Sequence, residues 1–179
     1  MPKITASTSI DGVLNVQLKA ISDQRGRFSE IFRKEWFPQR TWAALQSNHS
    51  ESAAGVLRGL HYHHHQVDYW YVIRGRIRAG LVDLRVSSPT HMKAVTLDLS
   101  REMGMGIYIP VGVAHGFLAL EDATILYIVD NYYNGQDEFG VMWNDADINL
   151  NWGVKVPLLS ERDRRNPRLK DIPISDLPK

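Results

Sequence analysis

The sequence of 179 residues contains no cysteine, which excludes disulfide bonds, thiolate metal ligands and cysteine nucleophiles. It also has no excess of either charge, with 21 Lys and Arg against 20 Asp and Glu. This balance argues against nucleic acid as a partner, because nucleic-acid-binding faces are rich in basic residues. Long hydrophobic runs are missing too. The most apolar region, 106–120, is interrupted by Pro110, Gly112 and His115, so we expect no membrane span.

Residues 1–7 lack the apolar stretch of a signal peptide, and we therefore expect a cytoplasmic protein. Hydrophobic residues make up 44% of the chain and charged residues 23%, which is the balance of an ordinary globular protein. A chain of this length is long enough to bury its own core. We therefore expect a single domain that spans residues 1–179.

Short runs of alternating apolar and polar residues fill the chain between residues 54 and 134, and turn residues separate them. The alternation is clearest in 94–99 and 124–130, where every second side chain is apolar. Several short strands at this spacing predict an all-β sandwich or barrel. Helical patterns are confined to the flanks, with a turn or two expected in 34–45 and a capping box at Ser160–Asp163.

Histidine is concentrated in one place, since four of the seven lie between His61 and His65. On a strand, alternate side chains point to the same face, so His61, His63 and His65 are predicted to share one. A carboxylate follows at Asp68, and another histidine, His115, closes the stretch Pro110-Val-Gly-Val-Ala-His. The plainer interpretation is a histidine-rich surface hairpin in which His64 at least is solvated.

These two stretches resemble the paired motifs of the cupin superfamily, with Asp68 standing where cupins usually have Glu. In that reading the metal ligands are His61, His63, Asp68 and His115. Imidazole and carboxylate ligands suit zinc, iron, manganese and nickel alike, so the residues do not name the metal.

A second resemblance covers the chain from about Ile21 to Pro167 and is carried by segments in a fixed order. They are Asp23-x-Arg-Gly-x-Phe-x-Glu30, Gln46-x-Asn-x-Ser50, Gly55-Val-Leu-Arg-Gly-Leu-His-Tyr62, Val82-Asp-Leu-Arg85 with Ser88-Pro-Thr90, Ile109-Pro-x-Gly-x-Ala-His-Gly-Phe117, Leu126-Tyr127, Trp143-Asn-Asp145 and Leu159-Ser-x-x-Asp163. The ordered set resembles the dTDP-4-dehydrorhamnose 3,5-epimerase family. The resemblance implies a cupin-type antiparallel β-jelly-roll, or double-stranded β-helix, with short flanking helices. It also implies a homodimer that requires no metal or other cofactor.

The family resemblance implies an isomerase that acts on a nucleotide-linked 4-keto sugar, in the biosynthesis of deoxysugar, lipopolysaccharide or capsule precursors. The ketone acidifies the protons on the carbons beside it, and inversion needs a base on one face and an acid on the other. His61 matches the family's base, for which an imidazole is suited. Asp163 matches the carboxylate that orients this histidine, and Tyr127 matches the acid.

The residues implied to bind substrate are matched in the same way. They are Arg25, Phe28, Glu30, Gln46, Asn48, Arg58, His63, Asp83 and His115. Arg25 and Arg58 match positions that hold the nucleotide diphosphate, where a guanidinium can donate two hydrogen bonds. Gly26 and Gly59 stand beside them and predict close approach of the backbone.

Asp68 departs from the family, which usually has a lysine there that binds the keto oxygen. Either a protonated His63 replaces that lysine, or a divalent metal acts as the Lewis acid, or the reaction differs. Inversion at C3 alone and 3,4-ketoisomerisation are therefore alternatives to the double epimerisation. A metal-dependent cupin enzyme and a non-catalytic sugar-binding cupin are two further ones. A binding module needs neither base nor acid, so the presence of both His61 and Tyr127 favours an enzyme.

Overall fold

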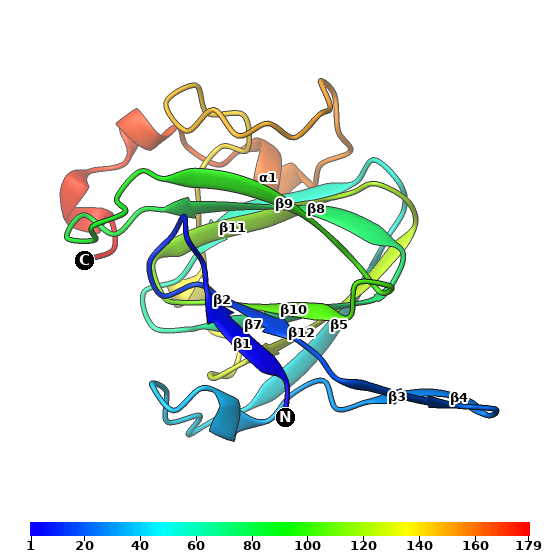
Figure 1. The fold of residues 1–179 in the computed structure, drawn as a ribbon. Helices are drawn as coiled ribbons and strands as arrows, with labels where there is room; N and C mark the ends of the chain where they lie inside the picture. The colour runs from blue at the N-terminus through cyan, green and yellow to red at the C-terminus, as the bar shows by residue number, and fades with distance from the viewer.

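Two antiparallel β-sheets face each other in the computed structural model, which describes residues 1–179 (Figure 1). The larger sheet has, in spatial order, β1 (Lys3–Ala6), β2 (Leu14–Gln17), β10 (Met105–Ile109), β7 (Asp68–Arg74), β12 (Ala123–Val129) and β5 (Gln46–Ser52). The smaller sheet has β13 (Phe139–Gly140), β6 (Leu57–Tyr62), β11 (Val113–Ala119), β8 (Arg76–Asp83) and β9 (Ala94–Ser100). All these strands pair antiparallel. The predicted all-β jelly-roll is confirmed.

The main hydrophobic core lies between the two sheets. Leu81 and Leu99 reach it from the five-stranded sheet, and Trp70, Ile107 and Ile125 reach it from the six-stranded sheet. Their alternation along the strands is the pattern that predicted the fold. Burying one such side chain stabilises the folded state by about 1.5–3 kcal/mol, so this layer holds the two walls of the sandwich together.

The outer faces of both sheets are covered as well. The C-terminal segment, orange to red in Figure 1, lies over the five-stranded sheet, and Ile148 and Trp152 anchor it to a second apolar cluster. Beneath the six-stranded sheet, Phe37 and Trp42 pack in a third cluster that includes Tyr69. Because both faces of β7 are buried, this strand reads as an almost continuous apolar run.

Helical structure is limited to single turns at the flanks, as predicted. These turns are η1 (Lys34–Trp36), η2 (Gly135–Asp137), α1 (Glu161–Arg164), η3 (Leu169–Asp171) and η4 (Ile174–Asp176). The helix expected within 34–45 is only the three residues of η1, because Pro38 biases Phe37 away from helical geometry. Ser160 is confirmed as the N-cap, since its hydroxyl accepts a hydrogen bond from the Asp163 backbone N–H at 3.0 Å. The reciprocal bond of a capping box is replaced by one from the Ser160 hydroxyl to the Asp163 carboxylate.

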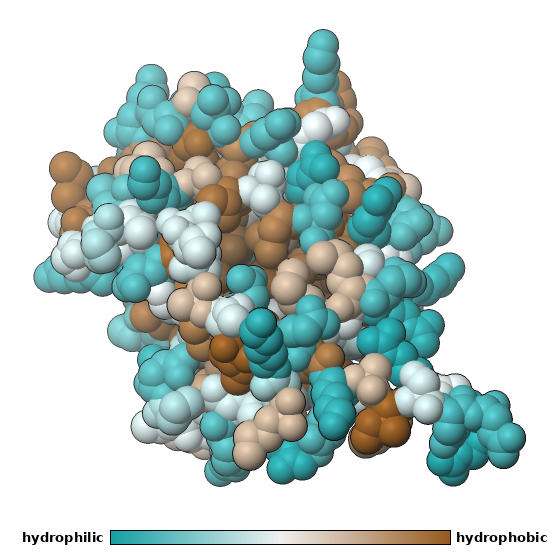
Figure 2. Space-filling view, in the orientation of Figure 1, coloured by the Kyte–Doolittle hydropathy of each residue, from teal (hydrophilic) through white to brown (hydrophobic).

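A two-stranded hairpin, β3 (Ala20–Asp23) and β4 (Gly26–Ser29), projects from the body of the molecule (Figures 1 and 2). Figure 2 shows a hydrophilic tip and hydrophobic atoms near the base of the hairpin. Ile21 and Phe28 pair directly across it, so both lie on the same face, and they are 60% and 64% exposed. Such a hairpin is marginally stable alone in water, which makes this apolar pair a candidate contact for another surface.

The helices give no indication of a membrane span, since none combines enough length with enough apolar character to cross a bilayer.

Candidate active site between the two sheets

A pocket of about 450 Å³ opens between the two sheets, within the usual size range of small-ligand sites. Its lining includes eight of the predicted site residues, namely Gln46, Asn48, Arg58, His61, His63, Asp68, His115 and Tyr127. Strands β6 and β11 supply the residues of one wall, and β5, β7 and β12 supply those of the other. Residues 131–138, which follow β12, and Arg162 complete the rim.

His61 lines the wall formed by β6 and is held from behind by Asp163. The His61 Nε2 and an Asp163 carboxylate oxygen are 2.6 Å apart. Burial raises the pKa of Asp163, but hydrogen bonds from His61 and Ser160 outweigh it and bring the pKa below its usual value. The ionised carboxylate therefore accepts the Nε2 proton, which leaves the His61 Nδ1 lone pair as the basic atom. The arrangement is that of a general base with an orienting acid.

Tyr127 lines the opposite wall, on β12 of the six-stranded sheet. Burial raises its pKa, and the nearby charge of Asp68 raises it further. The phenol is therefore protonated at neutral pH and is a proton donor. The pocket thus has a base on one wall and an acid on the other.

A second cluster lies deeper in the same pocket and consists of His63, Asp68 and His115. All three are buried, at 4–6% exposure, and their ligand atoms lie within 4.8 Å of one another. The two imidazole Nε2 atoms are 3.8 and 3.9 Å from the same Asp68 carboxylate oxygen. His61 is not in this cluster, so the predicted four-ligand metal site is wrong in that residue. The reason is that the ring nitrogen Nε2 of His61 is bound to Asp163.

Hydrogen bonds fix the orientation of both histidines in the cluster. The Nδ1–H of His63 donates to the carbonyl of Asp137 at 2.7 Å, and that of His115 donates to the carbonyl of Val113 at 2.9 Å. Since a carbonyl only accepts, each ring keeps its lone pair on Nε2, toward Asp68. Burial lowers the pKa of His115 to about 4, so its ring is neutral at physiological pH.

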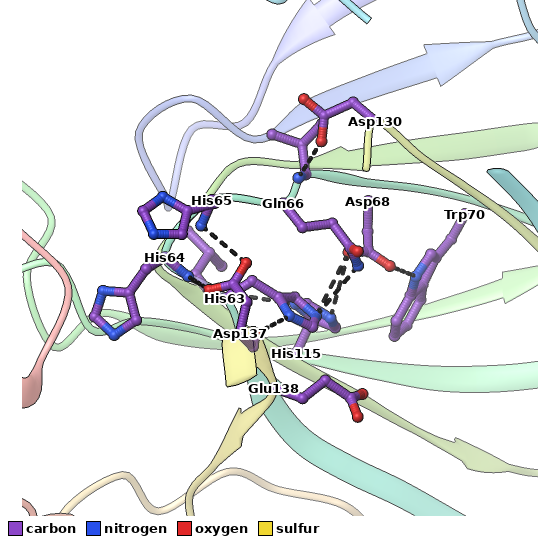
Figure 3. A network of polar contacts seen from close by, with 12 residues as sticks. His63, His64, His65, Gln66, Asp68, Trp70, His115, Asp130, Asp137 and Glu138 are labelled. Atoms are coloured by element: carbon purple, nitrogen blue, oxygen red, sulfur yellow. Dashed lines mark hydrogen bonds and ion pairs between the residues drawn. The ribbon is translucent and has the colours of Figure 1, made fainter. Parts of the chain in front are cut away.

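The loop after β6 explains why only some of the histidines enter the pocket. Strand β6 ends at Tyr62, so the two-residue period stops there. The carboxylate of Asp137 accepts the backbone N–H groups of His64 and His65 at 2.8 and 3.1 Å. Their rings point away from the cluster (Figure 3), and His65 is exposed. The prediction that His65 shares a face with His61 is therefore wrong. The interpretation as a histidine-rich surface hairpin applies only to His64 and His65.

The rim of the pocket carries the groups suited to a charged, polar ligand. Arg58 donates to the Ser52 hydroxyl at 3.0 Å and to a carbonyl, and it has no acidic partner. The positive charge of its guanidinium is therefore available to bind an anionic ligand. Other lining groups were not predicted, namely Gln66, Trp70, Tyr132, Tyr133, Asp137, Glu138 and Arg162. Tyr132 and Tyr133 stand side by side shortly after the apolar strand β12 and are 66% and 70% exposed. This aromatic pair is the one sequence signal that could have indicated the rim.

Asp83 does not line the pocket, contrary to its predicted role in substrate binding. Its fully buried carboxylate accepts hydrogen bonds from Arg85, Ser88 and Thr90, all at 2.6–2.8 Å. Burial raises the pKa of Asp83, but these bonds outweigh it and lower the pKa to about 2. Asp83 therefore stabilises the turn that follows β8.

Arg25, Phe28 and Glu30 also lie outside the pocket, on or beside the projecting hairpin. The Arg25 side chain is 85% exposed and pairs with Asp23, and Glu30 pairs with Arg33. Within one chain these residues do not line the pocket. Close approach at Gly26 is likewise wrong, because no atom lies within 4 Å of the place its Cβ would take, and Gly26 instead serves a positive φ of +130°.

Comparison with known proteins also indicates a nucleotide-sugar epimerase. The family described as dTDP-4-dehydrorhamnose 3,5-epimerase matches residues 7–171. A dTDP-4-dehydrorhamnose 3,5-epimerase of Shigella flexneri is 39% identical over 171 residues, covering 92% of this chain and 94% of that protein. A dTDP-4-dehydro-6-deoxyglucose 3-epimerase of Streptomyces is 34% identical over 169 residues, covering 90% and 86%.

The same relationship holds for solved structures. A dTDP-6-deoxy-D-glucose-3,5-epimerase of Legionella pneumophila, in complex with dTDP-4-keto-L-rhamnose, superposes with a TM-score of 0.92 at 32% identity. The match covers all of this chain and 98% of that one. Sequence, fold and pocket therefore agree, and the chain belongs to the dTDP-4-dehydrorhamnose 3,5-epimerase family of nucleotide-sugar isomerases.

Proposed function

We propose that the protein inverts C3, and C5 in the full reaction, of a dTDP-linked 4-keto-6-deoxyhexose by proton transfer through an enolate. The observation that carries this proposal is the placement of His61 and Tyr127 on opposite walls of one pocket. Inversion removes a proton from one face of a carbon and returns a proton to the other face. A base and an acid on facing sheets meet that requirement.

His61 is the base in this proposal. Its Nδ1 takes the proton from the carbon beside the ketone, and the electron pair of that C–H bond moves onto the ketone oxygen as the enolate forms. Asp163, 2.6 Å from Nε2, stabilises the imidazolium that results. This arrangement is worth roughly 10²–10⁴-fold in rate for a well-positioned general base.

Tyr127 is the acid. Its phenol donates a proton to the enolate carbon from the other face, which restores the ketone with inverted configuration. The raised pKa of Tyr127, caused by burial and by the charge of Asp68, keeps this proton in place until the enolate forms. His61 and Tyr127 then recover their starting protonation by exchange with water.

The nucleotide diphosphate is proposed to bind at the rim. Arg58 is the cation there that no carboxylate neutralises, so it can bind a phosphate without breaking an ion pair. Gln46 and Asn48, side by side on β5 and hydrogen bonded to each other at 2.9 Å, offer amide groups to the sugar or the base. His63 and His115 lie at the sugar end of the pocket, where the reacting carbons must reach His61.

A homodimer is part of the proposal, because three residues matched to substrate binding lie outside the pocket of their own chain. Arg25, Phe28 and Glu30 reach a ligand only if the hairpin of one copy extends to the pocket of another. The exposed pair of Ile21 and Phe28 gives that hairpin an apolar face to bury in the contact. A two-fold dimer would place each hairpin on the partner in the same way.

Inversion at C3 alone is the second candidate, because the relatives of this chain include a 34% identical Streptomyces 3-epimerase as well as 3,5-epimerases. The two candidates share base, acid and enolate, so they differ only in whether C5 is also presented to His61. Hydrogen exchange at the two carbons separates them.

The test uses a dTDP-linked 4-keto-6-deoxyglucose in deuterated water. The wild-type protein should incorporate deuterium at C3, and at C5 as well if both centres invert, which nuclear magnetic resonance resolves. His61→Asn should abolish exchange at both carbons, since removal of the proton is the first step. Tyr127→Phe should lower turnover more than exchange, because the acid acts after that step. Unchanged exchange in the His61 variant would refute the proposal.

A further inference from the structure

No residue of the cluster of His63, Asp68 and His115 gives or takes a proton in the reaction proposed above, and no cationic side chain outside the cluster balances the negative charge of Asp68. No lysine or arginine forms an ion pair with Asp68. The hydrogen-bond donors to its carboxylate are the neutral groups of Gln66 at 3.2 Å and Trp70 at 3.3 Å. A carboxylate that is 4% exposed is costly without a cation beside it.

We propose that the two Nε2 atoms of His63 and His115 and the carboxylate of Asp68 bind one divalent transition-metal cation, with His61 outside the site. Nitrogen and oxygen ligands lie about 2.0–2.2 Å from zinc, so two ligands of one ion are roughly 3–4 Å apart. The separations of the two imidazoles from Asp68, 3.8 and 3.9 Å, already fall in this range. Figure 3 shows the three side chains converging.

The hydrogen bonds around the cluster are those that metal ligands require. A ligating histidine usually donates its other ring N–H to a carbonyl or carboxylate, which fixes the tautomer and aims the lone pair at the ion. His63 and His115 both do so, through the carbonyls of Asp137 and Val113. Gln66 and Trp70 orient the carboxylate in the same manner. Both rings therefore carry their lone pair on Nε2. That of His63 faces the Gln66 amide at 3.5 Å, a long contact that a bound cation would replace.

The chemistry of the three ligands selects the class of cation. Two imidazoles and one carboxylate suit zinc, iron(II), manganese, cobalt or nickel. Magnesium and calcium prefer oxygen ligands throughout and are disfavoured here. Three protein ligands leave coordination positions for a ligand oxygen, and the cluster lines the same pocket as His61 and Tyr127.

The role assigned to the cation rests on the proposed function. When bound, a cation at this site acts as a Lewis acid on a carbonyl oxygen and stabilises negative charge that develops there. His61 remains free to act as the base, because it belongs to the pair with Asp163 and not to the cluster. A metal-bound imidazole has no lone pair for proton removal, so only this three-ligand site allows a bound metal and a working base together.

The first experiment measures metal binding alone, on tag-free protein stripped with a chelator and dialysed. Titration with Zn²⁺, followed by calorimetry and elemental analysis, should give one tightly bound ion per chain. Asp68→Asn and His63→Gln should lower the affinity by more than about a hundredfold, since even loss of an outer hydrogen bond costs 10–100-fold. His65→Gln is the matched control, because it removes an exposed imidazole of the same loop, and it should bind Zn²⁺ as the wild type does.

Circular dichroism and thermal unfolding confirm that each variant is folded before its affinity is interpreted. Co²⁺ is the second probe, because its visible absorption reports nitrogen coordination and should be lost in Asp68→Asn. Absence of stoichiometric Zn²⁺ in the wild type, or equal binding by Asp68→Asn and His65→Gln, would overturn the proposed site.

The second experiment separates this site from the proposed function. His61→Asn should bind Zn²⁺ with wild-type affinity while it loses hydrogen exchange. The stripped wild-type protein should exchange hydrogen at least about tenfold more slowly than the Zn²⁺-loaded protein. Tight Zn²⁺ binding with equal exchange in both forms would overturn the catalytic role of the cation and leave the function of His61 standing. An Asp68→Asn variant that no longer binds Zn²⁺ but exchanges hydrogen at the wild-type rate would also overturn that role.

Discussion

The buried carboxylate of Asp83 shows how a residue matched to an active site can instead support the fold. Its hydrogen bonds to Arg85, Ser88 and Thr90 are satisfied without any ligand. Because these bonds lower its pKa to about 2, folding is coupled to the ionised form. The associated stability is complete above the unfolded pKa near 4 and is lost as the pH falls through 2.

Asp83→Asn should therefore destabilise the protein at neutral pH, by about 3–5 kcal/mol, since it leaves Arg85 without its partner. The difference from wild type should shrink by about 2 kcal/mol between pH 4 and pH 2. Urea unfolding at a series of pH values measures both. Asp147→Asn, at an exposed position, is the control and should show neither effect. A constant difference across this pH range would contradict the linkage.

The residues of the site differ in how far the sequence could predict them. His61, Tyr127 and Asp163 were found because their motifs stand in the family's order, and the pocket brings the first two together. The ligand cluster was predicted with one residue too many, because spacing cannot show that the His61 Nε2 is bound to Asp163, 102 residues away. Asp137 was missed, since both its carbonyl and its carboxylate act on a loop more than 70 residues away in the sequence.

At the scale of elements, strands β6 and β11 must approach closely for the pocket to form. A Cβ at Gly59 would lie 2.6 Å from the Gly116 Cα and 2.9 Å from the His115 carbonyl oxygen. The register between the two strands also shifts in this region. The predicted close approach at Gly59 is therefore confirmed, and it sets the position of His61 opposite His115.

Gly59→Ala should destabilise the protein by about 2–4 kcal/mol, as a positive φ and a steric clash with backbone add together. Gly55→Ala is a matched control, because Gly55 also has a positive φ but no atom within 4 Å of its Cβ position. It should cost only about 1–2 kcal/mol. Thermal unfolding measures the difference, and similar losses in the two variants would show that the strands do not pack this closely.

The elements themselves were predictable where one strand face is buried and the other is not. Strand β9 is such a case, and its apolar residues do face the core. The end of β6 at Tyr62 was not predictable from local sequence. The Asp137 carboxylate that accepts the His64 backbone N–H in the next loop lies 73 residues further along the chain. The turn within 34–45 was predictable as a single turn before Pro38, whereas the burial of Phe37 and Trp42 against the six-stranded sheet was not.

At the scale of the whole molecule, the proposed dimer predicts that active sites are shared between chains. Arg25→Ala and His61→Asn should each reduce activity strongly when pure. If Arg25 serves the partner's pocket, a refolded equal mixture should recover activity, because each mixed dimer has one pocket with both native residues. The expected recovery is about a quarter of wild-type activity, as half of the dimers are mixed and each has one complete site.

Analytical ultracentrifugation of the wild type provides the complementary measurement and should show a dimer. Phe28→Ser should weaken it, since it replaces part of the apolar face of the hairpin. A mixture no more active than the average of its two components, or a strictly monomeric wild type, would contradict sharing of the site.

The two facing walls of the pocket have a consequence for the free protein. In the proposed reaction, each inversion would leave the imidazole of His61 with one proton more and the phenol of Tyr127 with one fewer. The protein that releases product would then be a different protonation isomer from the one that bound substrate. The two isomers interconvert only through water. A product epimer that binds the form with protonated imidazole and ionised phenol (the spent isomer) is converted back to substrate. The forward and reverse reactions therefore use different protonation forms of the same protein. Hydrogen taken from one sugar therefore passes to the solvent, except where an epimer binds the spent isomer before it exchanges and receives that hydrogen in the reverse reaction.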